Sequence, residues 1–524
     1  MTRDSIAPSS DGGWWPALGA GVGMFALAAL LLPPAPGMGD SAELTLALAL
    51  AGIPHPTGYP LYVLAGHVFA LAVHGLGASW VAASALWSAA GAAVALGAYV
   101  RLGQHVLSAL EDQARREGRV RDRSVVTWTA VALPALALAL NPIWIDSATV
   151  AEVYSWHHAC LALSAAFMMG WLRRLESIGA PPAPTPAQGA RSRLGSTELR
   201  GAATWGLLCG ACGAQHATAV FFVLPMTAAL VAGLVRARRW HPSLAFVSFG
   251  ASLVPLASYG WIAWRALHPA PFQWPVGVGL AALLMHVRGA AYSYLLGRFS
   301  PTTAEWVLIR GAILPWALPG LTLGSAFALS SRSTALRWGL LALFAAATIQ
   351  VAFIVSYGVP DPATYFLPVL MAALLAVTPG TVLLGRRVPA GLLAVIALGI
   401  VGAVAAWSVP RAVAQRAELA RVDAEFHAAW RAIPFDRGIV LWADDHYHRF
   451  VLIQLLEGAR PGLYVDNPEM LIWPGRRRAF AKRFGFDPLE GLTFRSEADL
   501  GKIPDNIRRR AHVPVAVIPE VHPQ

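Results

Sequence analysis

Long apolar runs separated by short polar loops fill most of the chain from residue 14 to residue 408. A helix needs about 20 apolar residues to cross the hydrocarbon core of a bilayer, and many of these runs approach that length. The pattern therefore predicts an all-α polytopic membrane protein with eleven spanning helices. The predicted spans are 14–34, 79–100, 125–141, 153–172, 203–214, 217–235, 242–264, 305–328, 338–357, 364–384 and 389–408.

One further apolar segment, 59–76, is better explained as a helix that lies in the membrane interface. Arginines gather in the loops between spans, and the positive-inside rule places such loops on the cytoplasmic side. The loop 37–78 contains no Lys or Arg, which indicates the opposite side. That placement holds only if 59–76, and 41–51 before it, do not cross the bilayer. The N-terminus is then cytoplasmic and the C-terminal tail extracytoplasmic.

The arginine-bearing loops used in this count are 101–124, 173–202, 236–239, 332–337 and 386–387. Within the second of them, residues 180–196 are rich in Pro, Ala, Gly and Ser, which is typical of a flexible linker.

Composition agrees with a membrane protein and excludes an ordinary soluble one. Hydrophobic residues make up 56% of the 524 residues, and mean hydropathy is +0.53. Charged residues make up only 13%, against about 25% in soluble domains. The net charge of +11 resides mainly in the loops, so it predicts orientation in a bilayer rather than binding of nucleic acid. The run 14–32 has one weak basic flank and fits a retained span better than a cleaved signal peptide.

From residue 409 the chain becomes mixed in charge and soluble in character. A helix is predicted at 411–432, strands at 438–445, 462–467 and 513–521, and a helix at 446–458. The chain is thus expected to have two domains, a transmembrane domain at 1–408 and a small extracytoplasmic α/β domain at 409–524. In the tail, Asp444, Asp445, His446 and His448 form a polar cluster. An acceptor-binding or metal site is one interpretation, and a solvated loop is the favoured one.

The three cysteines, Cys160, Cys209 and Cys212, all lie in apolar runs. Their placement excludes a disulfide framework in an extracytoplasmic domain. Cys209 and Cys212 have the spacing of a thioredoxin-like motif, but they lie in an apolar helix with Gly210 and Ala211 between them. Close helix packing through small residues is the better interpretation.

Candidate chemistry begins at the stretch "GDSAELTLALALAGIPHPTGYPLY", which follows the first span. Asp40 and Glu43 are three residues apart at the start of a predicted helix. This is the spacing of a capping box, and it is also a carboxylate pair suited to general-base attack by a hydroxyl. His55 follows in a turn that three prolines and a glycine make rigid. It is either incidental to the turn or a group aimed at a phosphate.

Four motifs occur in order: "GDSAEL", "GIPHPTGYPLY", "AEVYSW" at 151–156 and "GLLCGACGAQHAT" at 206–218. Together they resemble the polytopic membrane-protein family whose animal members are protein O-mannosyltransferases, in the GT-C superfamily of glycosyltransferases. The resemblance covers about 37–235 well. The chain departs from the family at Thr57, where a second proline is common, and at Gln215-His216, where the family has a His pair.

The resemblance implies an enzyme that transfers a sugar from a polyprenyl-phosphate carrier to a hydroxyl acceptor on the extracytoplasmic face, with inversion. The sugar implied by animal members is mannose, and the acceptor is a protein, a glycan or a lipid. No metal and no other cofactor is expected. Asp40 and Glu43 are the implied catalytic residues. The candidates for binding the donor phosphate or the substrate are His55, Tyr59, Glu152, Tyr154, His216, Arg265 and Arg288.

Some of these candidate residues have simpler structural roles. The whole protein also has alternative functions. Arg265 and Arg288 could instead snorkel to lipid phosphates, and Glu152 with Tyr154 could instead form hydrogen bonds between helices. A transporter or flippase of lipid-linked sugars also fits many spans with one broken helix. Such a protein more often shows repeated halves with paired interruptions, and no repeat is found. A membrane scaffold for the tail is a third alternative.

Overall fold

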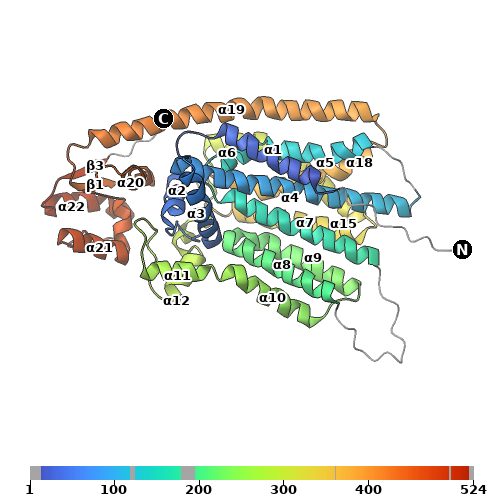
Figure 1. Cartoon of the computed structure of the whole chain (residues 1–524), viewed down its shortest axis with the longest axis horizontal. Coiled ribbons are helices and arrows are strands. Elements are labelled where there is room, and N and C mark those ends of the chain that lie inside the picture. The colour runs from blue at the N-terminus through green and yellow to red at the C-terminus, as the bar shows by residue number, and fades with distance from the viewer. Residues whose placement is uncertain (1–12, 119–123, 179–194, 360, 495–496, 519–524) are drawn as a thin grey trace.

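The computed structural model describes residues 13–118, 124–178, 195–359, 361–494 and 497–518. The predicted linker 180–196 lies outside the described residues up to residue 194. Helices that run side by side form a long bundle, and a small sheet with its own helices lies beyond one end of it (Figure 1).

The bundle helices α1, α4, α5, α7, α8, α9, α10, α15 and α19 lie along a common direction (Figure 1). The helical elements up to residue 432 are α1 (Trp15–Leu31), α2 (Ser41–Leu50), α3 (Pro60–Gly75), α4 (Trp80–Arg116), α5 (Ser124–Ala139), α6 (Pro142–Thr149), α7 (Tyr154–Ile178), α8 (Ser196–Gln215), η1 (Ala217–Ala219), α9 (Val220–Arg236), α10 (Pro242–Leu256), α11 (Tyr259–Leu267), α12 (Leu280–Val287), η2 (Ala290–Leu295), α13 (Thr303–Leu308), η3 (Ile309–Ile313), α14 (Leu314–Ser330), α15 (Thr334–Ile354), α16 (Pro362–Tyr365), α17 (Leu367–Leu374), α18 (Val377–Leu384) and α19 (Ala390–Ala432).

Within the described residues, seven helical segments are long and apolar enough to cross a membrane. The pair α5 and α6, bent by 62°, makes an eighth if it is counted as one broken span. These findings establish a multi-pass membrane protein. The other three predicted spans coincide with α1, α7 and α8, which do not meet the same criterion of length and hydropathy, so the count of eleven stays a prediction.

Two short helices lie across one end of the bundle, where the arginine count placed interfacial helices. Figure 1 shows α2 and α3 at a steep angle to the long helices. The side chains of Val68 and Leu71 in α3, and of Leu76 just after it, are exposed, as expected of a helix in the interface. In α2, every residue from Ser41 to Ala49 is buried. This differs from the expected interfacial helix, because the tail covers one face of α2 and helices α3 and α4 cover another.

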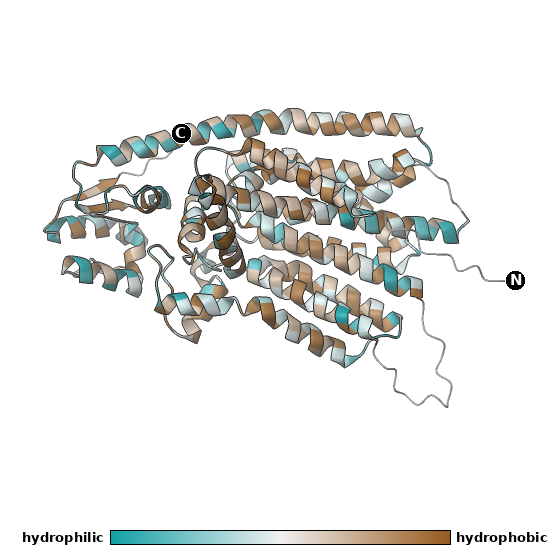
Figure 2. Ribbon diagram, in the orientation of Figure 1, coloured by the Kyte–Doolittle hydropathy of each residue, from teal (hydrophilic) through white to brown (hydrophobic). Residues whose placement is uncertain are grey.

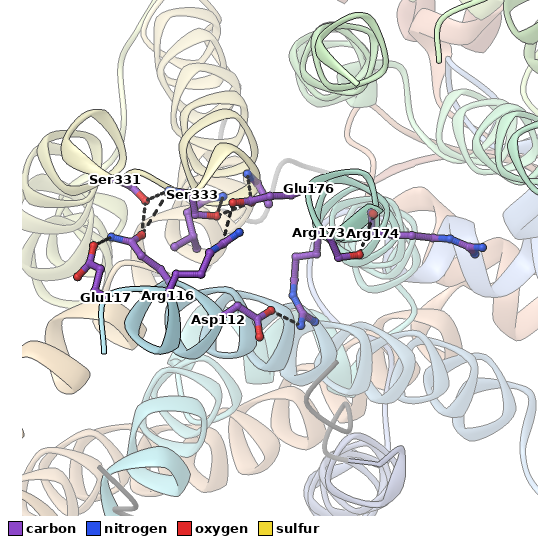
Figure 3. Close-up of polar contacts among 12 residues, drawn as sticks. Asp112, Arg116, Glu117, Arg173, Arg174, Glu176, Ser331 and Ser333 are labelled. Carbon is purple, nitrogen blue, oxygen red and sulfur yellow. Dashed lines mark hydrogen bonds and ion pairs between the residues drawn. The ribbon is translucent and has the colours of Figure 1, made fainter. Parts of the chain in front are cut away.

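The opposite end of the bundle carries the arginine-rich helix ends, and Figure 2 shows hydrophilic residues gathered there. Ion pairs tie three helical segments together at this end (Figure 3). Arg173 of α7 lies 3.1 Å from Asp112 of α4, and Arg116 of α4 lies 2.8 Å from Glu176 of α7. Ser333, which precedes α15, donates a 2.7 Å hydrogen bond to Glu176. The loops that were predicted to face one side of the membrane thus share one end of the bundle.

The chain leaves the bundle along α19 and then forms a three-stranded parallel sheet with strand order β2-β1-β3. Its strands are β1 (Gly438–Trp442), β2 (Leu463–Asp466) and β3 (Val515–Ile518), each inside a predicted strand. The surrounding helices are α20 (Tyr447–Leu456), η4 (Pro468–Ile472), α21 (Pro474–Phe484), η5 (Glu497–Lys502) and α22 (Ile503–Arg510). The predicted domain boundary between residues 408 and 409 falls inside α19, which continues through it.

The small residues of α8 bring its backbone against α10, as the Cys-Gly-Ala-Cys interpretation predicts. A Cβ atom on Gly206 would come within 2.0 Å of the carbonyl oxygen of Ser248, and one on Gly210 within 2.2 Å of that of Ser252. The two glycines are four residues apart on one face, the spacing at which small residues let helices approach closely in membranes. Cys209 and Cys212 are free thiols, and Gly210 between them is a point of close contact with α10.

We expect Gly210→Ala to lower the thermal stability of the purified protein, since the methyl group has no room beside Ser252. Overpacking of this kind costs about 1–3 kcal/mol. Thermal unfolding in detergent, followed by tryptophan fluorescence, measures the effect. The control is Gly250→Ala on α10, where a Cβ meets no atom within 4 Å. Equal unfolding temperatures for the two variants would contradict the close contact.

Candidate functional site

Asp40 lies at the N-cap of α2, but its side chain makes no capping hydrogen bond there. In a capping box, the Glu43 side chain would accept the backbone N–H of Asp40. Here its carboxylate is bonded to His55 instead. The capping-box interpretation is therefore wrong, although both residues stand at its positions. The spacing instead places two carboxylates on the first turn of one helix, both directed toward the turn that follows α2.

Glu43 and His55 form a buried pair. Glu43 is 1% exposed, and both of its carboxylate oxygens accept hydrogen bonds. One oxygen accepts the backbone N–H of His55 at 2.8 Å, and the other lies 2.6 Å from Nδ1 of the His55 ring. The Glu43 carboxylate therefore fixes both the backbone and the ring of His55.

The other ring nitrogen of His55 faces Asp40 and Tyr59. Its Nε2 atom lies 3.5 Å from the Asp40 carboxylate and 3.0 Å from the Tyr59 hydroxyl. The side chain of Asp40 is 47% exposed, whereas that of His55 is 10% exposed. Glu43, His55 and Asp40 thus form a line that begins in the protein interior and ends at a solvent-accessible carboxylate.

Charge stabilises the protonated form of His55. Burial by itself lowers its pKa, but the carboxylates of Asp40 and Glu43 outweigh burial and raise the pKa of His55 to about 10. Burial also raises the pKa of Glu43, and the nearby His55 opposes this effect. Because both oxygens of Glu43 accept hydrogen bonds, we treat the pair as a carboxylate and an imidazolium. At neutral pH His55 is then a cation between two carboxylates.

Three more carboxyl groups surround this cation. Glu152 lies between α6 and α7, where Ser88 of α4 bonds to both its backbone N–H and its carbonyl oxygen, at 2.9 and 3.1 Å. Burial, then the charges of Asp40 and Asp361, raise the pKa of Glu152 well above its usual range. Burial, then the charge of Asp40, raises the pKa of both Asp361 and Asp445 to about 7. Both Asp side chains are nevertheless exposed, so they border solvent within the site.

Aromatic rings line the other side of the site. The rings of Tyr59 and His216 are stacked with their centroids 5.6 Å apart. Tyr154 lies 5.7 Å from His216 and 5.5 Å from Tyr365, also between ring centroids. His216 lies in the break between α8 and η1, where the sequence predicts an interruption. A fifth ring, that of Tyr292, lies 6.2 Å from His55.

The turn that carries His55 is buried throughout. Its chain direction requires unusual backbone angles, with φ of +46° at Ala51, +84° at Gly58 and +40° at Tyr59. Residues with side chains rarely adopt positive φ, and such angles gather at functional sites. The segment after α11 covers the turn: the backbone N–H of Trp274 donates a 2.6 Å hydrogen bond to the carbonyl oxygen of Ile53.

The structure brings together most of the residues expected from the sequence. Those that meet around His55 are Asp40, Glu43, Tyr59, Glu152, Tyr154 and His216. Arg265 reaches the end of α2, where it donates a 3.5 Å hydrogen bond to the carbonyl oxygen of Leu50. Arg288 is exposed and precedes Gly289, which lies beside Thr57. Both arginines therefore border the turn rather than contact the Glu43–His55–Asp40 line.

Sequence analysis did not find Tyr292, Asp361 or Tyr365. Asp361 lies in the loop 358–363, which contains no Lys or Arg, and Tyr365 follows it. This absence of basic residues is the one signal that could have drawn attention to them. The solvated-loop interpretation of the cluster at 444–448 is wrong for His448, which is 2% exposed, and Asp445 belongs to the site.

Asp40, Glu43 and His55 also have the spacing of a metal site. One ligand atom from each lies within 4.8 Å of the others. Carboxylate oxygens and an imidazole nitrogen are ligands that several divalent cations accept. The 2.6 Å distance between Nδ1 of His55 and the Glu43 carboxylate is, however, that of a strong hydrogen bond. A proton therefore joins Glu43 to His55, and the Asp40 carboxylate lies 3.5 Å from the other ring nitrogen.

A bundle of apolar helices with an accessible carboxylate, a buried imidazolium and an aromatic wall at one end defines a multi-pass membrane protein with a candidate site at one end of its helical bundle. Residues 40–240 match the family described as protein O-mannosyl-transferase TMEM260, N-terminal domain. This match includes all four motifs from Asp40 onward and agrees with the resemblance that they indicate, to a family with protein O-mannosyltransferase members.

Comparison with curated proteins gives no match. Among solved structures, ArnT from Cupriavidus metallidurans bound to undecaprenyl phosphate is 16% identical, with a TM-score of 0.46 over 84% of this chain and 84% of that chain. The same protein in its apo state is 16% identical, with a TM-score of 0.42 over 83% of each chain.

The charge on His55 predicts how stability depends on pH. The pKa of His55, about 10, lies above the ordinary value of 6.5. The charged ring therefore stabilises the folded protein fully below pH 6.5, and this stabilisation is lost as pH rises through 10. Thermal unfolding at several pH values, followed by tryptophan fluorescence, should show wild type and His55→Gln converging between pH 7 and pH 10. His268→Gln, at an exposed position, is the control. A constant gap between wild type and His55→Gln would show that His55 is neutral throughout.

Proposed function

We propose that this protein is a membrane glycosyltransferase that moves a sugar from a polyprenyl-phosphate carrier to a hydroxyl acceptor. The observation that carries the proposal is the Asp40 carboxylate, which is accessible to solvent and held by a buried His55–Glu43 pair. The family match over residues 40–240 supports the same class of reaction. Mannose as the sugar and a protein Ser or Thr hydroxyl as the acceptor follow from the name of that family.

In the proposed reaction Asp40 accepts the proton of the acceptor hydroxyl. The hydroxyl oxygen attacks the anomeric carbon, and the bond from that carbon to the phosphate oxygen breaks. The electron pair of the broken bond leaves with the polyprenyl phosphate. A single displacement of this kind inverts the anomeric carbon. A positioned general base contributes typically about 10²- to 10⁴-fold to such a step.

His55 and Glu43 act in this scheme by holding Asp40. An imidazolium 3.5 Å from the carboxylate favours its ionised form and restricts its direction. Glu43 in turn fixes the ring through Nδ1, so the pair is a positioning device and not a second base. This role differs from the sequence interpretation of His55 as a phosphate ligand. The Nε2 atom of His55 lies near the reacting groups, but it already contacts Asp40 and Tyr59.

The departing phosphate needs cationic or hydrogen-bonding groups. Arg265 and Arg288 border the turn from the segment that covers it, and the Tyr292 ring lies between that segment and His55. We assign the donor phosphate to this side of the site.

The proposed site faces the extracytoplasmic side. The site and the tail lie at one end of the bundle, and the arginine-rich helix ends lie at the other (Figures 1 and 2). By the positive-inside rule the arginine-rich end is cytoplasmic. A flippase would more often place its acidic residues near the middle of the membrane, whereas here they gather at the surface with α2 and α3.

The test of this function uses purified protein in detergent and a panel of radiolabelled polyprenyl-phosphate sugars. Wild type should release or transfer sugar from at least one donor, and Asp40→Asn should lose roughly 10²-fold or more of the rate, because the base is removed. Tryptophan fluorescence checks that both are folded. Asp505→Asn, with a side chain 67% exposed on α22, is the control for the charge change.

Other outcomes of this assay would point elsewhere. Equal rates for wild type and Asp40→Asn would eliminate Asp40 as the base. Movement of sugar lipid across vesicles, without turnover of any donor, would establish the flippase alternative. A cellular role that survives the loss of Asp40 would favour the scaffold.

We further expect that removal of divalent cations leaves the rate unchanged, since a proton already joins His55 to Glu43. Turnover is measured after incubation with EDTA and again after adding back Mg²⁺ or Mn²⁺. A loss of activity that either cation restores would show that Asp40, Glu43 and His55 hold an ion.

A further inference from the structure

The backbone just before Asp40 has few supports of its own. Asp40 is the N-cap residue of α2, and its side chain makes no capping hydrogen bond. Its carboxylate lies 3.5 Å from Nε2 of His55 and is about half exposed. The two residues before it, Met38 and Gly39, are exposed, and Gly39 adopts a φ of +64°. The position of Asp40 therefore depends on how the chain is held before this exposed pair.

Pro36 and Gly37 come before the exposed pair and are buried. On one side they meet the end of α6, because a Cβ atom on Gly37 would come within 2.9 Å of the Val150 side chain. The backbone N–H of Gly37 donates a 3.0 Å hydrogen bond to Oγ of Ser41, in the first turn of α2. The segment is thus seated against the bundle and tied to the start of α2.

On the other side, one arginine of the tail holds this segment. The Nη2 atom of Arg449, on α20, donates hydrogen bonds of 2.9 Å to the carbonyl oxygens of both Pro36 and Gly37. The same nitrogen lies 3.6 Å from the sulfur of Met38. The guanidinium is a planar group whose N–H donors have a fixed geometry. Two bonds from it to successive carbonyls therefore fix the direction of the backbone as well as its distance from α20.

Arg449 is itself fixed within the tail. Its side chain is 3% exposed, and its Nη1 atom lies 3.4 Å from the carboxylate of Asp423 on α19. Its guanidinium lies over the ring of Phe426, 4.9 Å from the ring centroid. The other carboxylate oxygen of Asp423 lies 3.4 Å from Nδ1 of His427. A buried cation is costly without such partners, and together they give the guanidinium one defined position.

The same part of the tail packs against α2. Ala42 and Leu46 of α2 belong to one hydrophobic cluster with Phe426 and Trp430 of α19 and Phe450 of α20. The tail therefore contacts both the helix that begins at Asp40 and the segment that leads into it.

We propose that Arg449 is a positioning residue for Asp40. It fixes the backbone three and four residues before Asp40, so that the carboxylate enters α2 within reach of His55 and of the acceptor hydroxyl. Arg449 acts through the backbone and does not touch the reacting atoms. A displacement of about 1 Å at a reacting group can cost about 10²-fold in rate, so such a distant contact affects the reaction. This inference rests on the proposed function and extends its machinery into the tail.

The experiment uses the full-length protein and the polyprenyl-phosphate sugar that wild type turns over in the panel. Hydrolysis of this donor is measured over a range of donor concentrations. Arg449→Met should lower kcat roughly 10- to 100-fold. It should leave the KM for the donor unchanged, because Arg265 and Arg288 on the phosphate side stay in place. Arg449→Lys should recover part of kcat, since its ammonium can still donate to a carbonyl oxygen.

Arg460→Met is the matched control, because Arg460 makes the same kind of contact elsewhere in the tail. Its Nη1 atom donates hydrogen bonds of 3.1 and 2.8 Å to the carbonyl oxygens of Trp430 and Ile433, at the end of α19. Thermal unfolding, followed by tryptophan fluorescence, measures how far each variant destabilises the protein. Arg460→Met should lower the unfolding temperature, as Arg449→Met does, yet keep the kcat of wild type.

Hydrogen–deuterium exchange provides a readout that does not depend on activity. In Arg449→Met the backbone amides of residues 37–44 should exchange faster than in wild type, because their anchor is lost. In Arg460→Met they should exchange as in wild type. If Arg449→Met fails to fold, Arg449→Lys and Asp423→Asn provide the test. Asp423→Asn loosens the guanidinium without removing it, so both variants should show smaller changes in the same direction.

Three results would overturn the inference while leaving the function intact. One is a wild-type kcat in the variants of Arg449. Another is unchanged exchange at residues 37–44. The last is an equal loss of kcat in Arg460→Met at an equal loss of stability, which would show that only the stability of the tail matters. Absence of donor turnover by wild type would instead remove the proposed function, and the catalytic consequence of Arg449 with it.

Discussion

The site depends on a positive charge in a place that water barely reaches. A buried imidazolium is costly unless oppositely charged groups surround it, and Glu43 and Asp40 supply those charges to His55. This requirement explains why α2 begins with two carboxylates on one turn. It also explains why the chain reverses so tightly after α2, with Ala51 and Tyr59 at positive φ: the ring must return to the helix start twelve residues earlier.

The molecule distributes its polar groups between its two ends in different ways. At the arginine-rich end, ion pairs such as Arg173 with Asp112 join neighbouring helices (Figure 3). Around His55, by contrast, several carboxyl groups lie close together, and three of them, Glu152, Asp361 and Asp445, have raised pKa values. Carboxyl groups held close together repel one another and so do not stabilise the fold. Perturbed pKa values of this kind cluster at functional sites.

The amino-acid pattern predicts much of this architecture for physical reasons that act locally. Arginine placement predicts that 41–51 and 59–76 are separate from the spans, and α2 and α3 lie across the bundle. Gln215-His216 interrupts an apolar run, and α8 ends there. The three strands of the tail follow from short apolar runs between turns. Each of these features is encoded within about twenty neighbouring residues.

The remainder depends on contacts between distant parts of the chain. Asp361 reaches the site from a loop and Tyr292 from the short helix η2, and neither segment has a motif of its own. The spacing of Asp40 and Glu43 suits both a helix cap and a catalytic pair, and only the position of His55 distinguishes the two. The burial of α2 could not be predicted either, because the residues that cover it, such as Phe426 and Phe450, come after the last span.

That late arrival orders events during biosynthesis. The helix α2 is made early, but part of its core comes from residues that are made last, such as Phe450. Arg449 of α20 donates hydrogen bonds to the carbonyl oxygens of Pro36 and Gly37, just before Asp40. The candidate site therefore depends on the end of the chain, because the contacts that fix the start of α2 can form only when the tail has been made and has folded.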